Sequence, residues 1–568
     1  MTYRKKLIEV ALPLEAINME SAREKSIRHG HPSTLHLWWS RKPLATARAV
    51  LWASLVDDPS SWPEKFPTPE AQTQERQRLF DILARIVVDT DNKGKQKQVV
   101  RGLVSWDDIK DPQVIQGAQR EIARCLAWGR GEKPPTTAEA VRDYIAQYAP
   151  PAYDPFAGGG SIPLEAQRLG LEAHASDLNP VAVLINKGLI EIPPKFANLP
   201  PVNGDDRKRT RLESWHGAQG LAADVRYYGT WMREAAFNRI GDLYPPVELG
   251  NGEKATVIAW LWVRTVTCPN PACGCQMPLT SKFHLSTKKG KEAWVEYAIN
   301  RETSPPQVDF VVKTGEGKPP ESPKTGRGAK FRCLACGTPV DSKYIRKEAI
   351  DERMGAQLMA IVAEGHRGRV YLAPTPEHQN IANNAIPEWK PTQELADDPR
   401  NIWCVSYGLN TFDKLFTRRQ LVALTTFSDL VGEAKDKAFQ NALAVGLSDD
   451  DIPLNDGGNG ARAYSEAIAI YLAFAVDKIA DYNNNLCTWN INREGIGHLF
   501  TKQAIPMAWD FVEANPISDS SGSFNGSINW VLRVVENAKT EVEGKVFQQD
   551  AQVSHKNDDI PKIISTDP

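Results

Sequence analysis

Three consecutive glycines stand in a short segment that starts with an acidic residue, Asp154-Pro155-Phe156-Ala157-Gly158-Gly159-Gly160. The residues that follow, 161–169, predict a helix that Ser161 can cap and Gly170 can end. Pro163 is tolerated in the first turn of such a helix. A glycine-rich turn between a strand and a helix lets a ligand approach the backbone, so the segment predicts a nucleotide-type binding turn.

A second carboxylate follows at the spacing that such a unit requires. A predicted strand over residues 172–176 ends on Asp177, where a carboxylate can accept hydrogen bonds from both ribose hydroxyls. A dinucleotide site needs glycine where Pro163 stands, and a helix N-terminus free of negative charge because the pyrophosphate lies there. Asp154 opposes a pyrophosphate but suits a ligand with an ammonium and a sulfonium group. The residues therefore favour S-adenosylmethionine over a dinucleotide.

Four cysteines form two closely spaced pairs, each followed by a glycine: Cys268 with Cys273, and Cys333 with Cys336. The glycines let the backbone turn so that N–H groups point at thiolate sulfur, and two such knuckles predict one tetrahedral zinc site. Because sulfur would fill every position, the zinc would be structural rather than catalytic. Cys275 is an alternative to Cys273 as the ligand. The other cysteines are expected to be core thiols: Cys125, Cys404 and Cys487.

The segment from His31 to Leu44 combines two adjacent tryptophans with histidine, arginine and lysine. Trp38 and Trp39 could line a pocket for a base or for methionine. In the alternative interpretation both tryptophans lie in the core and Arg41 lies on the surface. The residue types by themselves favour the second interpretation and leave both open.

Composition excludes several classes of protein. Of the 568 residues, 41% are hydrophobic and 24% charged, which is typical of a soluble globular chain with more than one domain. Lys plus Arg (68) and Asp plus Glu (70) nearly cancel, so nucleic-acid binding must depend on a local basic patch. The stretch from Lys282 to Lys347 is one candidate, although such a run is more often a solvated loop.

Neither a secretory signal nor a membrane span is expected. Glu9 and Glu15 interrupt the N-terminal segment. The longest apolar run, residues 467–476, is half as long as a membrane span requires and predicts a buried helix. Eight cysteines in so long a chain do not make a disulfide framework. We therefore expect a cytoplasmic protein.

The patterns divide the chain into five regions: a helical region, residues 1–149; the strand and glycine-turn unit, 150–201; an insert with the cysteine knuckles, 202–350; a helix-rich insert suited to target recognition, 351–543; and two final strands, 544–568. Within the helix-rich insert, Thr417 and Gln420 have the spacing of a capping box. The final strands are expected at residues 545–547 and 562–565.

The segment from Asp154 to Gly160 resembles motif I of the DNA amino-methyltransferases, Asp-Pro-Phe-x-Gly-x-Gly, residue for residue. The resemblance assigns binding of S-adenosylmethionine to Asp154, Pro155, Phe156, Gly158, Gly160 and Asp177. The N-terminal segment resembles the opening domain, of unknown function, of the zinc-ribbon adenine-specific DNA methylases found in phage-defence gene clusters. Its His-Pro and Lys-Pro-Leu are similar to motif X, which implies that Lys42 and Pro43 flank the methionine end of the cofactor.

In that family, motif IV (Asp/Asn/Ser-Pro-Pro-Tyr/Phe) follows the fourth strand and holds the amino group of a flipped base. The last residues, Asp567 and Pro568, match its first half, whereas Asn515-Pro516-Ile517 lacks the second proline and the ring. Asp550 follows the expected third strand, where such enzymes contact the cofactor's adenine. The resemblance implies catalytic roles for Asp567 and Pro568. It also implies that the chain stops inside the motif, so that it binds cofactor weakly and does not methylate.

The resemblance as a whole implies an α/β fold: a Rossmann-like S-adenosylmethionine-dependent methyltransferase core, interrupted by a long zinc-binding, helix-rich insert, with a helical N-terminal region. The expected activity is methyl transfer to an exocyclic amino group of a flipped base in double-stranded DNA, adenine rather than cytosine. The setting would be phage defence or restriction–modification, with defence-system partner proteins. Two alternatives stay open. One is a non-catalytic DNA-binding or cofactor-sensing subunit whose partner polypeptide supplies the Pro-Tyr half of motif IV, and the other is a methyltransferase that acts on RNA or protein.

Overall fold

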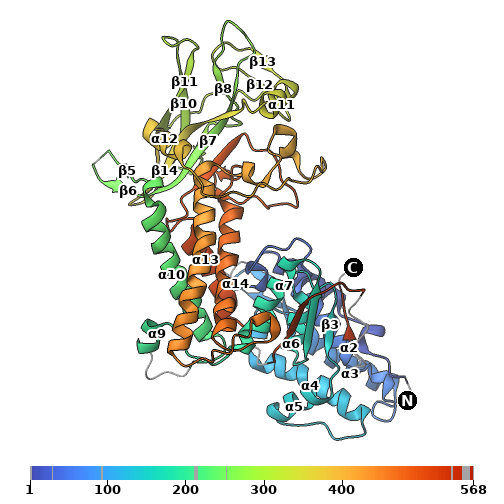
Figure 1. The fold of residues 1–568 in the computed structure, drawn as a ribbon. Coiled ribbons are helices and arrows are strands. Elements are labelled where there is room, and N and C mark those ends of the chain that lie inside the picture. The colour runs from blue at the N-terminus through green and yellow to red at the C-terminus, as the bar shows by residue number, and fades with distance from the viewer. Residues whose placement is uncertain are drawn as a thin grey trace. The chain divides into compact units, whose positions relative to one another are not determined.

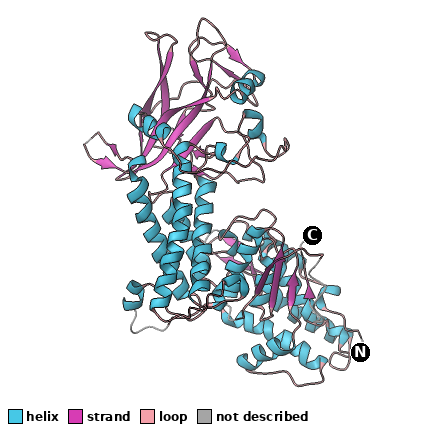
Figure 2. Cartoon of the chain, viewed as in Figure 1, coloured by secondary structure: helices cyan, strands magenta, loops and turns pink. Residues whose placement is uncertain are grey.

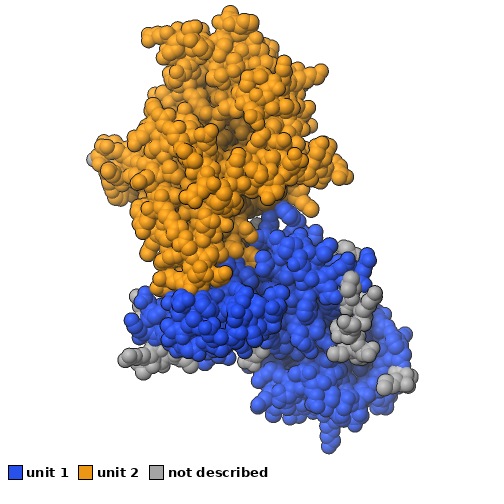
Figure 3. Space-filling view, in the orientation of Figure 1, with its two compact units in different colours: residues 1–224, 439–471, 530–568 blue, residues 225–438, 472–529 orange. Residues whose placement is uncertain are grey.

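The structure, a computed structural model, describes residues 3–27, 30–90, 94–209, 215–250, 252–538, 542–552 and 563–566. The chain divides into two compact units, which Figure 3 colours separately. Unit 1 comprises residues 1–224, 439–471 and 530–568, and unit 2 comprises residues 225–438 and 472–529. The divisions fall inside long helices, so that each of these contributes to both units: α10 (Gln219–Ile240), α13 (Arg418–Ala444), α14 (Ala461–Tyr482) and α15 (Phe524–Glu536).

Helices and one hairpin make up the first part of unit 1 (Figures 1 and 2). They are α1 (Leu14–Glu24), α2 (Leu44–Leu55), α3 (Pro69–Leu83), β1 (Arg85–Thr90), β2 (Gln96–Arg101), α4 (Pro112–Gly129) and α5 (Ala138–Tyr148). Helices α3, α4 and α5 are each capped at the N-terminus by a side-chain oxygen that accepts a hydrogen bond from a backbone N–H of the first turn. The capping residues are Thr68, Asp111 and Thr137. Helix α2 is apolar on nearly every face, which is why it is buried among the others.

Unit 1 also contains a parallel sheet of four strands in the order β19-β4-β3-β20. Its strands are β3 (Ala152–Asp154), β4 (Ala173–Asp177), β19 (Lys545–Gln548) and β20 (Ile563–Ile564). The helical elements that follow β3 and β4 are α6 (Ser161–Arg168), α7 (Pro180–Asn186), a π-helical turn (Lys187–Glu191), α8 (Ile192–Lys195) and α9 (Gly204–Arg209). Strand β3 is short because Pro150 and Pro151 precede it and lack the N–H that a ladder needs.

The core of unit 2 surrounds an antiparallel sheet. Its order is β15-β14-β7-β18, and β8 pairs with β7. The strands are β7 (Val257–Thr267), β8 (Gln276–Pro278), β14 (Gly355–Gly365), β15 (Gly368–Leu372) and β18 (Asp510–Ala514). Strand β7 is buried along almost its whole length: Trp260 and Trp262 belong to one apolar core, and Leu261 and Val263 to another. This alternation follows from the two-residue period of a strand.

Short strands and helices complete unit 2. They are β5 (Val247–Glu248), β6 (Lys254–Ala255), β9 (His284–Ser286), β10 (Ala293–Asn300), β11 (Gln307–Thr314), β12 (Phe331–Arg332), β13 (Pro339–Val340), α11 (Ser342–Ile350), α12 (Pro376–Asn384), β16 (Thr488–Asn490) and β17 (Gly495–Gly497). The sequence patterns divide the two inserts at residue 350, but this boundary runs through one sheet. Strand β7 precedes residue 350, and its hydrogen-bonded neighbours β14 and β18 follow it. No helix in the described part of the chain is both long and apolar enough to cross a membrane.

Several local predictions are confirmed. Thr417 and Gln420 form the capping box, with Thr417 N donating to Gln420 Oε1 (2.8 Å) and Gln420 N to Thr417 Oγ1 (3.1 Å). The apolar run 467–476 lies within α14. The prediction that Ser161 caps α6 is wrong. Gly160 is the capping residue, and the Ser161 hydroxyl donates instead to the carbonyl oxygen of Lys42 at 2.7 Å.

Candidate functional site

The glycine turn lies at the carboxyl end of β3, in the middle of the parallel sheet. In the register of the sheet, Tyr153 pairs with His174 of β4 and Ile564 of β20 pairs with Tyr153 on the other side. The carboxyl ends of parallel strands share one edge of a sheet. The turn therefore lies at the same edge as Asp177, the last residue of β4.

Backbone hydrogen bonds hold the two carboxylates in fixed positions around the turn. Gly158 N donates to Asp177 Oδ2 (2.9 Å), and Asn179 N donates to Asp177 Oδ1 (2.9 Å). Asp154 is 2% exposed, and its Oδ1 accepts a hydrogen bond from Phe156 N (3.0 Å). The Phe156 ring itself is 60% exposed at this edge. The turn thus combines two positioned acids with an accessible aromatic ring.

The N-terminal segment covers the glycine turn. A Cβ atom on Gly158 would come within 2.7 Å of Trp38 Nε1, and one on Gly159 within 2.9 Å of Arg41 Cζ. A Cβ on Gly158 would collide with the indole ring of Trp38, whereas one on Gly159 would meet the flexible end of the Arg41 side chain, which can move aside. Gly158 also has a φ of +47°, in the left-handed region that glycine favours. Glycine is therefore required at position 158, where both the positive φ and the Trp38 ring disfavour a larger residue.

Arg41 contacts the glycine turn through a backbone carbonyl oxygen and not through an ion pair with a described carboxylate. Its Nη1 donates to the carbonyl oxygen of Gly159, while its Nε and Nη2 atoms are buried and have no hydrogen-bond partner among the described residues. Burial lowers the pKa of the Arg41 guanidinium to about 10. The interpretation that places Arg41 on the surface is wrong, and Trp39, at 47% exposed, is not a core residue either. A desolvated guanidinium with two unused donors suits a carboxylate ligand.

Asn186 is a site residue that the sequence patterns missed. Its Nδ2 donates to the carbonyl oxygen of Gly158 (3.1 Å), and a Cβ on Gly160 would lie 2.7 Å from its Oδ1. Asn186 Oδ1 is buried and has no hydrogen-bond partner among the described residues. An asparagine inside helix α7 carries no signal of such a role, because only the packing of α7 brings it to the turn.

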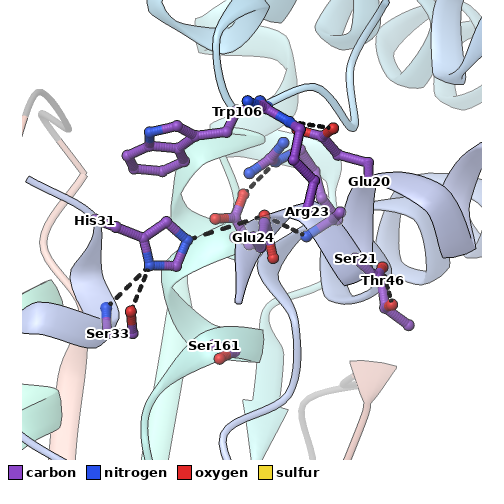
Figure 4. A network of polar contacts seen from close by, with 12 residues as sticks. Glu20, Ser21, Arg23, Glu24, His31, Ser33, Thr46, Trp106 and Ser161 are labelled. Atoms are coloured by element: carbon purple, nitrogen blue, oxygen red, sulfur yellow. Dashed lines mark hydrogen bonds and ion pairs between the residues drawn. The ribbon is translucent and has the colours of Figure 1, made fainter. Parts of the chain in front are cut away.

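A buried polar network ties together the elements that carry the N-terminal segment (Figure 4). Trp106 N donates to Glu20 Oε1 (2.9 Å), and Ala45 N donates to Glu24 Oε1 (3.0 Å). The His31 ring packs on Trp106 with 4.6 Å between ring centroids, and its Nε2 lies 4.0 Å from Glu24 Oε1. These contacts hold α1 and the start of α2 together, which positions the segment from His31 to Lys42.

A fully buried ion pair joins α2 to the helix of the glycine turn. Arg48 Nε lies 2.5 Å from Glu165 Oε2, and Arg168 Nη1 lies 2.8 Å from Glu165 Oε1. Arg48 and Glu165 are both 0% exposed. Burial by itself raises the pKa of Glu165, but the charges of Arg168 and Arg48 outweigh it and hold the pKa below its usual value. Glu165 therefore remains ionised at neutral pH.

Glu165→Gln is expected to destabilise the protein by about 3–5 kcal/mol, because it leaves buried guanidinium groups without their counter-charge. Chemical denaturation followed by circular dichroism measures the change. The control is Glu172→Gln, which breaks a pair with Lys545 whose side chains are 47% and 57% exposed and should cost less than about 1 kcal/mol. Equal losses in the two variants would show that the buried pair contributes no more than a surface pair.

Four more of the predicted residues lie at or near the same edge of unit 1. Lys42 is held by its carbonyl oxygen to Ser161, and Pro43 precedes the first residue of α2. Pro155 follows β3 directly, and Asp550 is exposed, two residues after the end of β19. The predicted catalytic pair, Asp567 and Pro568, lies outside the described residues.

The four predicted metal ligands come together in unit 2. The sulfur atoms of Cys268, Cys273, Cys333 and Cys336 all lie within 4.8 Å of one another. Two of the sulfur–sulfur distances are 3.6 Å (Cys268 to Cys336) and 3.9 Å (Cys273 to Cys333). Tetrahedral zinc with Zn–S bonds of about 2.3 Å requires sulfur atoms about 3.8 Å apart, so the geometry is consistent with a structural zinc site.

Glycines shape both knuckles of this cluster. Gly274 and Gly337 have φ angles of +58° and +78°, and Gly337 N donates to the carbonyl oxygen of Cys333 (2.8 Å). The left-handed conformation turns the chain directly after the second cysteine of each pair. The cluster contains Cys273, whereas Cys275 is buried beside it and is not one of the four. All eight cysteines are free, and Cys125, Cys404 and Cys487 are buried as predicted.

Comparison with known proteins identifies only the N-terminal part. Residues 11–82 match a family model described as a protein of unknown function (DUF1156). These residues include α1, α2 and the segment that covers the glycine turn. Searches of the curated proteins and of the solved structures find no match.

Proposed function

We propose that the protein is an S-adenosylmethionine-dependent methyltransferase that acts on the exocyclic amino group of adenine in DNA. The observation that carries the proposal is the glycine turn with its two carboxylates. Gly158 N and Asn179 N orient Asp177, and Asp154 lies buried at the start of the turn. This is the arrangement that a nucleoside with a positively charged tail needs, with one acid for the ribose and one near the charge.

The topology of the sheet supports the same proposal. With β3 as the first strand of the unit, the order β19-β4-β3-β20 corresponds to 3-2-1-4, the first four positions in the 3-2-1-4-5-6 order of a doubly wound nucleotide-binding sheet. In such sheets ligands bind outside the carboxyl ends of the strands, where the strand order reverses. Here that place lies between β3 and β20, next to the glycine turn.

The residues present fit the cofactor. Asp177 would accept hydrogen bonds from the ribose hydroxyls, and the exposed Phe156 ring would cover the adenine. The unused donors of Arg41 would hold the methionine carboxylate, with Lys42 and Pro43 following it in the chain. The bound cofactor supplies an activated methyl group. The protein contributes positioning, because a neutral amino nitrogen needs only to be held in line with that group.

Two further parts of the proposal concern the rest of the chain. Asp567 and Pro568 would begin the motif that holds the amino group of the flipped base. The four cysteines would hold a structural zinc ion in a DNA-contacting insert. A role in phage defence or restriction–modification, with partner proteins, rests on the resemblance of the N-terminal segment.

Isothermal titration calorimetry with the purified chain tests the cofactor assignment. S-adenosylmethionine is expected to bind one-to-one, and NAD is expected not to bind, because Asp154 opposes a pyrophosphate. Binding of NAD, or of neither ligand at millimolar concentration, would overturn the proposal. Methyl transfer to DNA, RNA and protein is then assayed with tritiated cofactor. Label in RNA or protein but not in DNA would exclude DNA as the substrate.

A further inference from the structure

Unit 2 contains a cavity of about 870 Å³, well away in the chain from the glycine turn. Strands β7, β16 and β18 and helix α11 contribute to its walls, together with the segment that precedes β12. Volumes of 300–1,000 Å³ are typical of sites for small ligands and cofactors. No residue of the proposed cofactor site lines this cavity.

The walls of the cavity are rich in aromatic rings. Trp489 and Trp509 are only 6% and 7% exposed, and the ring of Tyr407 packs edge-on against Trp509 at 5.0 Å between centroids. These rings form a rigid lining. Trp403 also lines the cavity but is 46% exposed, so its ring is accessible to a ligand. An accessible indole beside a fixed aromatic lining suits a flat aromatic group.

The cavity also carries an excess of positive charge. Lys282, Lys324 and Arg346 line it. Lys282 Nζ donates to the carbonyl oxygen of Trp489 (3.4 Å), and the charged groups of Lys324 and Arg346 lie over the rings of Phe331 and Tyr407. The acidic residue of the lining is Asp510, whose two oxygens accept hydrogen bonds from Ser281 N at 2.9 and 3.0 Å. Three cations against one carboxylate favour a ligand with negative charge.

We propose that this cavity binds a nucleotide, with its base stacked on Trp403 and its phosphate held by Lys324 and Arg346. Every nucleobase offers a π-face to an aromatic side chain, and lysine and arginine are the usual partners of phosphate. A nucleotide of a DNA strand and a free nucleotide share this chemistry. The inference is independent of the proposed methyltransferase function, because unit 2 does not contain the glycine turn.

Asp510 gives the cavity a dependence on pH. Burial raises the pKa of Asp510 to about 6, in spite of hydrogen bonds from Thr280 and Ser281 and the charge of Lys282. The charged and titratable groups of the lining are Lys282, His284, Lys324, Arg346 and Asp510. As the pH falls from 7.5 to 5, Asp510 loses most of its negative charge, so the single-stranded DNA, whose phosphodiesters keep their charge over this range, should bind roughly 5- to 20-fold more tightly. Asp510→Asn should bind more tightly at pH 7.5 and change less between the two pH values.

Fluorescence anisotropy with a labelled twelve-nucleotide single-stranded DNA, and calorimetry with dAMP, test the proposal on the full chain. Trp403→Ala is expected to weaken binding roughly 5- to 150-fold, which is the loss of one stacked base. The matched control is Trp389→Ala, because Trp389 is also 46% exposed in unit 2 but does not line the cavity. Arg346→Ala should reduce the slope of log affinity against log salt for the single-stranded DNA by about 0.7. Lys347→Ala, on the same helix and outside the lining, should not.

The two ligands distinguish the source of the nucleotide. Binding of the oligonucleotide without dAMP identifies a nucleotide within a strand, and binding of both identifies a site that a free nucleotide can fill. Failure of both ligands to bind at low salt overturns the proposal. It is equally overturned if Trp403→Ala and Trp389→Ala have the same effect. Because the assay needs no S-adenosylmethionine, its failure is distinguishable from failure of the proposed function.

Discussion

Cys333→Ser is expected to abolish metal binding and to unfold the segment around β12 and β13. Three remaining thiolates cannot complete a tetrahedral sulfur site, and metal binding supplies folding energy that such small hairpins lack. In isolated zinc-finger peptides this energy reaches about 10–16 kcal/mol, which is an upper bound here because a large apolar core surrounds the cluster. Elemental analysis of the purified protein should give one zinc per chain for the native protein and none for the variant.

Cys275→Ser is the matched control for this prediction. Cys275 is as deeply buried as Cys268, Cys273 and Cys333 but is not part of the four-cysteine cluster, so its variant should retain one zinc per chain. Hydrogen exchange measured over β12 and β13 separates local unfolding from global unfolding. Treatment of the native protein with a strong chelator should reproduce the exchange pattern of Cys333→Ser. Retention of zinc by Cys333→Ser together with loss of zinc in Cys275→Ser would contradict the prediction and show that Cys275, not Cys333, is a metal ligand.

Asp177→Asn is expected to weaken the binding of S-adenosylmethionine by roughly 10- to 160-fold. Hydrogen bonds to a charged acceptor contribute about 1.5–3 kcal/mol, and the change to an amide removes the charge while preserving the shape. The amide oxygen can still accept one of the two backbone N–H groups that Asp177 holds, Gly158 N or Asn179 N. Calorimetry measures the dissociation constant.

Glu172→Gln is the control, because Glu172 precedes β4 and lies at the opposite end of the strand from Asp177. Its affinity for S-adenosylmethionine should match that of the native protein. A circular dichroism spectrum shows whether Asp177→Asn folds as the native chain does. Native-like affinity in a well-folded Asp177→Asn variant would remove Asp177 from the cofactor site.

Local structure around the candidate site could be predicted from the sequence to a useful extent. The predicted helix at 161–169 corresponds to α6, the strand that ends on Asp177 corresponds to β4, and the final strands correspond to β19 and β20. The capping box at Thr417 is present as well. Each depends on residues a few positions apart, for which sequence spacing is almost a direct measure of distance in space.

Contacts over long sequence distances could not be predicted in the same way. Residue type favours a surface position for Arg41, because arginine is mostly exposed in proteins, yet the turn of residues 158–160 packs against it. Serine is a common helix-capping residue, yet the Ser161 hydroxyl donates its hydrogen bond to the backbone carbonyl oxygen of Lys42 instead. The sequence does not predict the antiparallel sheet of unit 2, because β7, β14 and β18 are widely separated and β7, buried on both faces, shows no alternating polarity.

The sequence by itself determined which residues are candidates for ligand and metal binding. They are the acids and glycines of the turn, and the four cysteines with a glycine after each pair. Residue type and local backbone geometry suffice for that, since they are properties of short segments. Only the tertiary structure decided how these segments meet. It joins two distant cysteine pairs into one cluster, places β19 and β20 on either side of β4 and β3, and brings Arg41 and Asn186 to the glycines. The physical reason is that such meetings depend on the packing of whole faces of helices and strands, which no single segment encodes.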